Sequence, residues 1–162
     1  MDEKYWETRH NGLYMDNPNR EHFVKKEGVL DIPAFEAFVS EHKIVFPETY
    51  IRFLKKYNGL ESDKKLYFSF VSGTKADVVV PLVLPFGQAV KEYVVLREHP
   101  KVKENYFPIA ETTSAYMSIM LKVKGRNKGK IYFFDGIRHM VDMIADYESI
   151  GDFLGALDIN IE

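Results

Sequence analysis

The stretch Val45–Glu61, VFPETYIRFLKKYNGLE, contains the signals of a complete helix with both of its ends. Pro47 and Glu48 suit a first turn, because no amide donor is needed there and the helix dipole favours a negative charge. Asn58-Gly59 supplies the stop, since glycine readily adopts the left-handed conformation that caps a helix. The intervening residues follow the i, i+3, i+4, i+7 spacing of one core-facing stripe: Tyr50, Phe53, Leu54 and Tyr57.

A second amphipathic helix precedes this stretch, in DIPAFEAFVSEHKI at residues 31–44. Asp31 can cap it and Pro33 fits its first turn. Its apolar stripe has the same spacing: Phe35, Phe38, Val39 and His42. Two further helices are predicted, one in GQAVKEYVVLREHP at residues 87–100 and one in SIGDFLGAL at residues 149–157.

From Leu66 onward the apolar period changes from helical spacing to two, which predicts β-strands. The glycine-bearing loop GRNKG and the tight turn Asp135-Gly136 then predict hairpins. The fold class is therefore α+β, with a mainly antiparallel sheet of about five to six strands and helices packed on it. The predicted strands are LYFSFV at 66–71, DVVVPLVL at 77–84, YMSIMLKVK at 116–124, KIYFFDG at 130–136 and IRHMVDMIA at 137–145.

Length and composition indicate one domain with a substantial core. The chain has 162 residues, of which 46% are hydrophobic, and it has no cysteine, so disulfides and thiolate metal sites are excluded. We expect residues 31–162 to form the domain and residues 1–30, which show no steady period, to form an irregular arm. The N-terminus lacks the apolar run of a signal peptide, and the longest apolar run is too short to cross a bilayer, so we expect a cytoplasmic protein without a membrane partner.

Charge is unevenly distributed along the chain. The net charge is -2, which argues against direct nucleic-acid binding. After Arg138 there is no lysine or arginine, and this acidic end could be a solvated surface or a docking face for a basic partner. Basic residues cluster around GRNKG, either to bind phosphate or to keep a hairpin tip soluble. The acidic residues after Arg138 are Asp142, Asp146, Glu148, Asp152, Asp158 and Glu162.

The common signatures of catalysis are missing from the sequence. It has no GxSxG, GxxxxGK[ST], GxGxxG or HExxH motif, and no two histidines are four residues apart. Pairs of carboxylates such as Asp135 and Asp142 could perform acid–base chemistry, but 24 acidic residues make such pairs expected by chance. We therefore predict no catalytic residue, cofactor or metal site. The five histidines stand singly at His10, His22, His42, His99 and His139.

Two blocks of the sequence resemble the SUKH superfamily, the fold of the yeast cell-wall-synthesis regulator and of bacterial toxin-immunity proteins. The first is FPETYIRFLKKYNGLE, which has the family's aromatic-Pro, its tyrosine-bearing helix and its Asn-Gly. The second is FPIAETTSAYMSIMLKVKGRNKGKIYFFDG, at residues 107–136. A closing helix with Phe153 and Leu157 also agrees, and the resemblance extends over roughly residues 32–157.

The resemblance implies a binding module without chemistry of its own, an immunity protein that neutralises a cognate toxin domain, often a nuclease. A regulatory or scaffolding adaptor without catalysis is the alternative that the yeast relative suggests. A small hydrolase whose site is assembled from scattered residues stays open as a third reading. Tyrosine and arginine are favoured at binding hot spots, and acidic residues suit a basic partner. The candidate partner-binding residues are Tyr67, Tyr116, Tyr132, Asp135, Arg138, Asp142 and Asp146.

Overall fold

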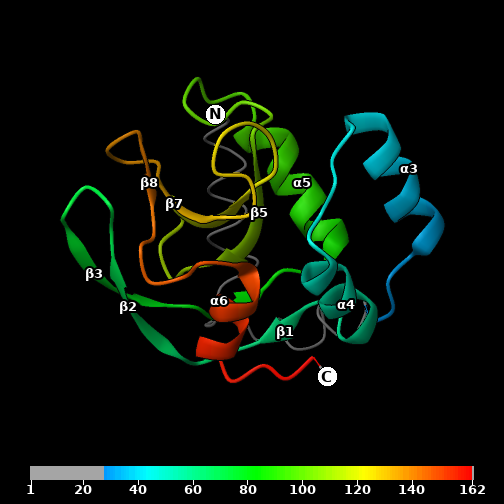
Figure 1. Cartoon of the computed structure of the whole chain (residues 1–162), viewed down its shortest axis with the longest axis horizontal. Helices are drawn as coiled ribbons and strands as arrows, with labels where there is room; N and C mark the ends of the chain where they lie inside the picture. The colour runs from blue at the N-terminus through cyan, green and yellow to red at the C-terminus, as the bar shows by residue number, and fades with distance from the viewer. Residues whose placement is uncertain (1–27, 162) are drawn as a thin grey trace.

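A computed structural model describes residues 28–161 and shows an α+β fold (Figure 1). The helices are α3 (Ile32–His42), α4 (Glu48–Lys56), α5 (Phe86–Leu96) and α6 (Ile150–Ala156). The strands are β1 (Leu60–Glu61), β2 (Lys65–Ser69), β3 (Lys75–Val79), β4 (Leu82–Val83), β5 (Tyr106–Glu111), β6 (Met117–Lys122), β7 (Ile131–Asp135) and β8 (Met140–Met143).

Six of these strands form one antiparallel sheet in the order β1-β4-β5-β6-β7-β8, while β2 and β3 pair as a separate hairpin. Figure 1 places α3, α4 and α5 toward one side of the molecule and the β2–β3 hairpin toward the other. The predicted fold class and the mainly antiparallel sheet are thus confirmed. The predicted arm of residues 1–30 lies almost entirely outside the described residues, although Leu30 is already buried in the core.

Helices α3 and α4 form as their sequences indicate. The Asp31 carboxylate accepts the Ala34 amide proton at 3.1 Å, which caps α3, and Phe35 and Phe38 are buried. In α4, Tyr50, Phe53 and Leu54 of the predicted stripe are each 0% exposed, while Tyr57, just past the end of the helix, is half-buried.

The end of α4 is fastened to the beginning of α5. Asn58 and Gly59 both have positive φ, and the buried Asn58 side-chain oxygen accepts the Phe86 amide proton at 2.8 Å. A Cβ added at Gly59 would lie 2.7 Å from Pro85 Cγ, so this close approach requires glycine. The Asn-Gly pair is therefore both a helix stop and a joint between two helices.

The sheet differs from the sequence prediction in several places. β1 was not predicted, and β8 begins only at Met140, because residues 137–139 of the predicted strand IRHMVDMIA belong to the turn after Asp135. DVVVPLVL, predicted as one strand, is divided around Pro81 into two strands of different sheets, β3 in the hairpin and β4 in the six-stranded sheet. Proline has no amide proton to donate to a ladder, so pairing changes where it occurs. FPIA, which was not among the predicted strands, lies within β5, a strand whose six residues are all buried and which therefore shows no alternation. Its proline is tolerated because the β5–β6 register shifts between Pro108 and Ala110.

The core is organised around Phe107 of β5. Its ring centroid lies 5.6 Å from that of Phe38 in α3, 4.9 Å from Phe46 and 5.5 Å from Tyr93 in α5. These distances are within the range of favourable aromatic pairs. Phe107 thus contacts α3, α5 and the segment that leads into α4, whereas the β2–β3 hairpin lies toward the other side of the molecule.

Candidate functional site

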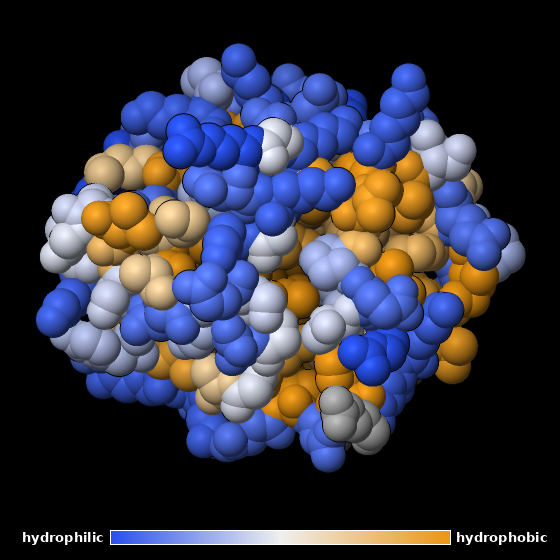
Figure 2. Space-filling view, in the orientation of Figure 1, coloured by the Kyte–Doolittle hydropathy of each residue, from blue (hydrophilic) through white to orange (hydrophobic). Residues whose placement is uncertain are grey.

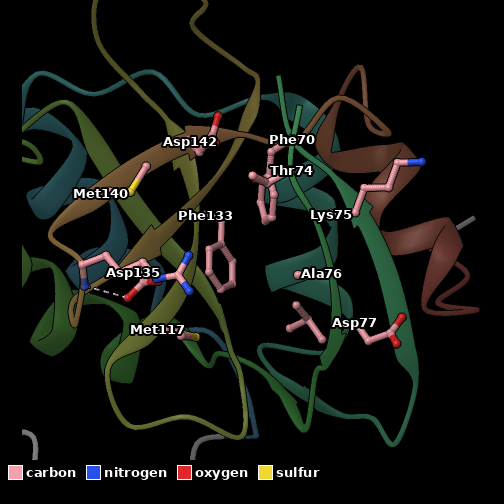
Figure 3. Close-up of a pocket in the computed structure, with 12 residues that line it drawn as sticks. Phe70, Thr74, Lys75, Ala76, Asp77, Met117, Phe133, Asp135, Met140 and Asp142 are labelled. Atoms are coloured by element: carbon pink, nitrogen blue, oxygen red, sulfur yellow. Dashed lines mark hydrogen bonds and ion pairs between the residues drawn. The ribbon is translucent and has the colours of Figure 1, made fainter. Parts of the chain in front are cut away.

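A cleft of about 310 Å³ lies between the β2–β3 hairpin and strands β6–β8; we call it the β3–β8 cleft. Figure 3 shows β3 residues on one side of it and Phe133 and Asp135 on the other. The lining residues are Phe70, Thr74, Lys75, Ala76, Asp77, Val78, Met117, Phe133, Asp135, Arg138, Met140 and Asp142.

The hairpin reaches this position because its first strand is attached to the end of β8. Phe70 forms an isolated bridge with Ile144, and the Val71 amide donates to the Met143 carbonyl at 2.9 Å. The hairpin then curls over the sheet, so that the Phe70 ring lies 5.5 Å from that of Phe133. The cleft remains open on the β3 side of this contact.

Strand register determines which side chains face the cleft from the sheet. Met117 pairs with Asp135, and Asp135 pairs with Met140, so these three side chains share one face. Phe133, two residues before Asp135, lies on the same face. This face of the sheet thus combines three apolar side chains with one carboxylate.

Apolar side chains are also exposed beside the cleft. Val71, Ile137 and Met140 are 58%, 62% and 45% exposed. Figure 2 shows apolar atoms among hydrophilic ones over the end of the β2–β3 hairpin and the β7–β8 turn. Large hydrophobic residues exposed around a cleft are typical of surfaces that contact other macromolecules.

The charged residues of the cleft are partly engaged in shaping it. Asp135 Oδ1 accepts the amide protons of Ile137 and Arg138 at 3.0 and 3.1 Å, and its Oδ2 lies 3.8 Å from Arg138 Nε. Asp142 Oδ2 accepts a hydrogen bond from the Ser72 hydroxyl, which connects β8 to the β2–β3 turn. These carboxylates fix the β7–β8 turn and the hairpin turn.

A family model matches residues 30–156, the model of the SMI1/KNR4 family (SUKH-1). The chain belongs to this family. The predicted SUKH resemblance is therefore confirmed. No curated protein and no solved structure matches the chain significantly. Membership in SUKH-1 is compatible with a toxin-immunity role or a regulatory role, and the family is generally non-catalytic. Among residues 28–161, no helix is long and apolar enough to span a membrane.

In this SUKH-1 domain, the structure brings three of the predicted partner-binding residues together, Asp135, Arg138 and Asp142, which all line the β3–β8 cleft. Asp146 lies at the base of the hairpin, where its Oδ1 accepts the Ser69 amide proton at 2.5 Å.

The three predicted tyrosines lie apart from one another. Tyr67 is 56% exposed on the outer face of the hairpin, opposite Asp77. Tyr116 is 44% exposed beside the cleft, and its carbonyl accepts the Gly136 amide proton at 2.6 Å. Tyr132 is only 8% exposed and packs against Tyr106 on the other face of the sheet, with 5.0 Å between the ring centroids.

Sequence reasoning did not identify the apolar part of the cleft, which consists mainly of Phe70, Met117, Phe133 and Met140. In β7, alternation could have identified Phe133, because it lies two residues before the candidate Asp135 and therefore on the same face of the strand. No local signal places Phe70 there, since its position depends on the long-range bridge to Ile144.

The acidic C-terminal segment of the SUKH-1 domain is partly neutralised. Glu148 pairs with Lys130, whose ammonium hydrogen bond lowers the pKa of the Glu148 carboxyl. Asp158 lies 2.5 Å from Lys64 and its hydrogen bond raises the pKa of that amine. Asp152 Oδ2 accepts the Glu148 amide proton at 3.1 Å. Of the acidic residues after Arg138, Asp142 lines the cleft and Asp146 binds the Ser69 amide at the base of the hairpin.

Two of the singly spaced histidines meet in space. His99 Nε2 lies 3.2 Å from His139 Nδ1, and His99 Nδ1 accepts the Lys101 amide proton at 3.2 Å. Burial, followed by the charges of His139 and Lys101, lowers the pKa of His99. Within residues 28–161, no three His, Cys, Asp or Glu side chains are grouped so that they could hold a metal ion. His10 and His22 lie outside the described residues.

Proposed function

We propose that this SUKH-1 chain is an immunity protein, which binds a cognate toxin domain through the β3–β8 cleft and thereby neutralises it. The observation that carries the proposal is the cleft itself, in a family compatible with toxin immunity. It combines an apolar centre with charged residues at its border, as protein interfaces do.

The state of the cleft carboxylates supports binding over hydrolysis. Asp135 accepts two backbone amide protons, and Asp142 accepts the Ser72 hydroxyl proton. These oxygens accept hydrogen bonds from the chain itself and stabilise turns, which favours a structural and contact role for the two carboxylates over that of a general base. Arg138, with a side chain that is 76% exposed, is well placed as a contact for a protein partner.

Charge supports a partner with a basic surface, such as a nuclease domain. Three carboxylates line the cleft, from Asp77, Asp135 and Asp142, against the two cations Lys75 and Arg138. Asp146 adds a further negative charge at the hairpin base. Complementary charge accelerates encounter and selects among partners. We expect the association rate to fall as the salt concentration rises; a rate unaffected by salt would refute this steering.

If the chain is an immunity protein, we expect a toxin gene next to its own gene, and the test is to co-express the chain with the toxin domain encoded there. We expect the wild type to restore growth, and Met140→Glu, which places a charge at the cleft border, to weaken binding by about tenfold or more. Val45→Glu is the matched control, because Val45 is 68% exposed and does not line the cleft. Growth that is not restored, or equal loss from both variants, would refute the proposal. A regulatory adaptor would instead co-purify with a partner that is not toxic when expressed alone.

A further inference from the structure

The hydrogen-bond register of the β2–β3 hairpin leaves one edge of β3 unpaired. The Phe70 amide donates to the Thr74 carbonyl at 2.9 Å, and the Val80 amide donates to the Lys64 carbonyl at 3.0 Å. In an antiparallel pair, alternate residues bond across the ladder and the residues between them turn their amide and carbonyl groups outward. The outward residues of β3 are Lys75, Asp77 and Val79.

The corresponding outward groups of β2 are already used. The Ser69 amide donates to Asp146, and its carbonyl accepts the Ala145 amide proton at 2.7 Å. Among residues 28–161, no comparable partner is seen for the outward backbone groups of β3. An unpaired edge of five residues is a template for one more strand.

This edge borders the β3–β8 cleft, since residues 74–78 form one side of it. We propose that β3 accepts an extended segment of the protein partner as an additional strand. The inference rests on the proposed function and specifies how the partner binds. Backbone hydrogen bonds to Lys75, Asp77 and Val79 would supply affinity, and the cleft would receive alternate side chains of the segment.

The charges on β3 specify the chemistry of that segment. Lys75 and Asp77 are both exposed and lie two residues apart, so they present opposite charges on one face. Charged residues on an edge discourage unselective pairing. A strand with an acidic residue opposite Lys75 and a basic residue opposite Asp77 is stabilised by both cross-strand pairs. Asp77 Oδ2 also lies 3.6 Å from Lys65 Nζ on β2, so the incoming base would share this exposed carboxylate with Lys65.

The residue between these two charges would point to the other face, toward Phe133 and Met117 in the cleft. It should therefore be apolar, because Phe133 and Met117 present apolar side chains there, although Asp135 shares the same face of the sheet. The expected partner sequence is an acid, an apolar residue and a base in succession, in either chain direction.

The test removes one outward amide without changing the rest of the ladder. Proline is tolerated on an edge where its missing amide proton would face outward, so Asp77→Pro deletes a donor to the incoming strand. Asp77→Ala is the matched control, since it removes the same carboxylate and keeps the amide. Lys75→Pro serves as the second variant, and thermal unfolding identifies which proline variant keeps the hairpin intact.

The probe is a phage-displayed library of random dodecapeptides, selected on the full wild-type chain. We expect selected peptides to contain the acid–apolar–base triad and to bind the folded proline variant at least about tenfold more weakly than Asp77→Ala. Peptide binding should also slow amide hydrogen exchange at Lys75, Asp77 and Val79. The inward amides of Ala76 and Val78 should change little, because β2 already bonds them.

Several results would overturn strand addition: no binder from the library, equal binding to both Asp77 variants, or protection elsewhere than on β3. Self-association of the wild type that is lost in Asp77→Pro would assign the edge to a second copy and refute the partner-strand proposal. If co-expression with the toxin restores growth and Asp77→Pro restores it equally, the mode of binding fails while the immunity function stands. If library peptides bind as expected but the toxin is not neutralised, the function fails and the binding mode stands.

Discussion

Replacing Gly59 by alanine should be among the most damaging single-methyl changes in this domain. Gly59 has a φ of +105°, where a Cβ costs about 1–2 kcal/mol of strain. The new Cβ would also lie 2.7 Å from Pro85 Cγ and 2.8 Å from Pro85 N, so backbone must move, and overpacking of this kind costs about 1–3 kcal/mol. We expect Gly59→Ala to lower the free energy of unfolding by about 2–5 kcal/mol.

Two other glycines allow the cost of strain at a positive φ to be measured separately from the cost of the overlap with Pro85. Gly73 has a φ of +101°, but a Cβ added there would meet nothing within 4 Å, so Gly73→Ala should cost only the strain, about 1–2 kcal/mol. Gly155 lies in α6, where an added Cβ would likewise meet nothing within 4 Å, so Gly155→Ala should stabilise the domain by about 0.5–1 kcal/mol.

Guanidinium unfolding of the four proteins, followed by circular dichroism, measures these differences from midpoints at a common slope. The expected order of stability is Gly155→Ala, wild type, Gly73→Ala and Gly59→Ala. A Gly59→Ala protein as stable as Gly73→Ala would show that the contact with Pro85 is not tight, and would refute the idea that Asn-Gly joins two helices.

Three further stability changes follow from the same structure. Asn58→Ala should cost about 1–3 kcal/mol in guanidinium unfolding, because the buried Phe86 amide loses its acceptor. Phe107→Ala should cost about 3–5 kcal/mol, since it removes the ring around which the helices pack. Lowering the pH below about 6.5, the usual histidine pKa, should destabilise the wild type, because His99 has a lowered pKa in the folded state and the unfolded chain then binds more protons. The guanidinium midpoint should fall more between pH 7.5 and 5.5 in the wild type than in His99→Gln.

Each of these three predictions would be contradicted by a specific result. An Asn58→Ala protein with unchanged stability would mean that water replaces the side-chain oxygen at the Phe86 amide. Phe107→Leu should cost less than Phe107→Ala, and equal costs would deny that lost volume is the cause. Equal pH sensitivity in wild type and His99→Gln would assign the effect to other titrating groups.

Local patterns were sufficient to predict the helices and most of the sheet. Asp31, Asn58 and Ser149 mark helix ends through their own backbone contacts, and the structure shows Ser149 accepting the Asp152 amide proton as expected. Alternation identified β2, β6 and β7. It failed for β5, because both faces of that strand are buried. It also failed at Pro81, because β3 before the proline pairs with β2, whereas β4 after it pairs with β1 and β5.

The cleft was predictable only in part, because it is made by contacts between distant segments. Asp135, Arg138 and Asp142 were candidates by residue type and were found together at one place. Tyr132 was a candidate for the same reason, yet strand register places it on the opposite face from Phe133. The meeting of His99 and His139 likewise results from tertiary packing, which residue spacing does not encode.

Buried and exposed side chains alternate along the two strands of the β2–β3 hairpin, and this affects which residues can change in proteins of this kind. Leu66, Phe68 and Val78 belong to the core, whereas Tyr67 and Asp77 face outward from the same two strands. We expect the exposed odd positions, such as Tyr67 and Asp77, to tolerate substitution better than the buried even positions. If the hairpin contacts a partner, substitutions at these few alternate positions would change the surface offered to that partner with little effect on folding.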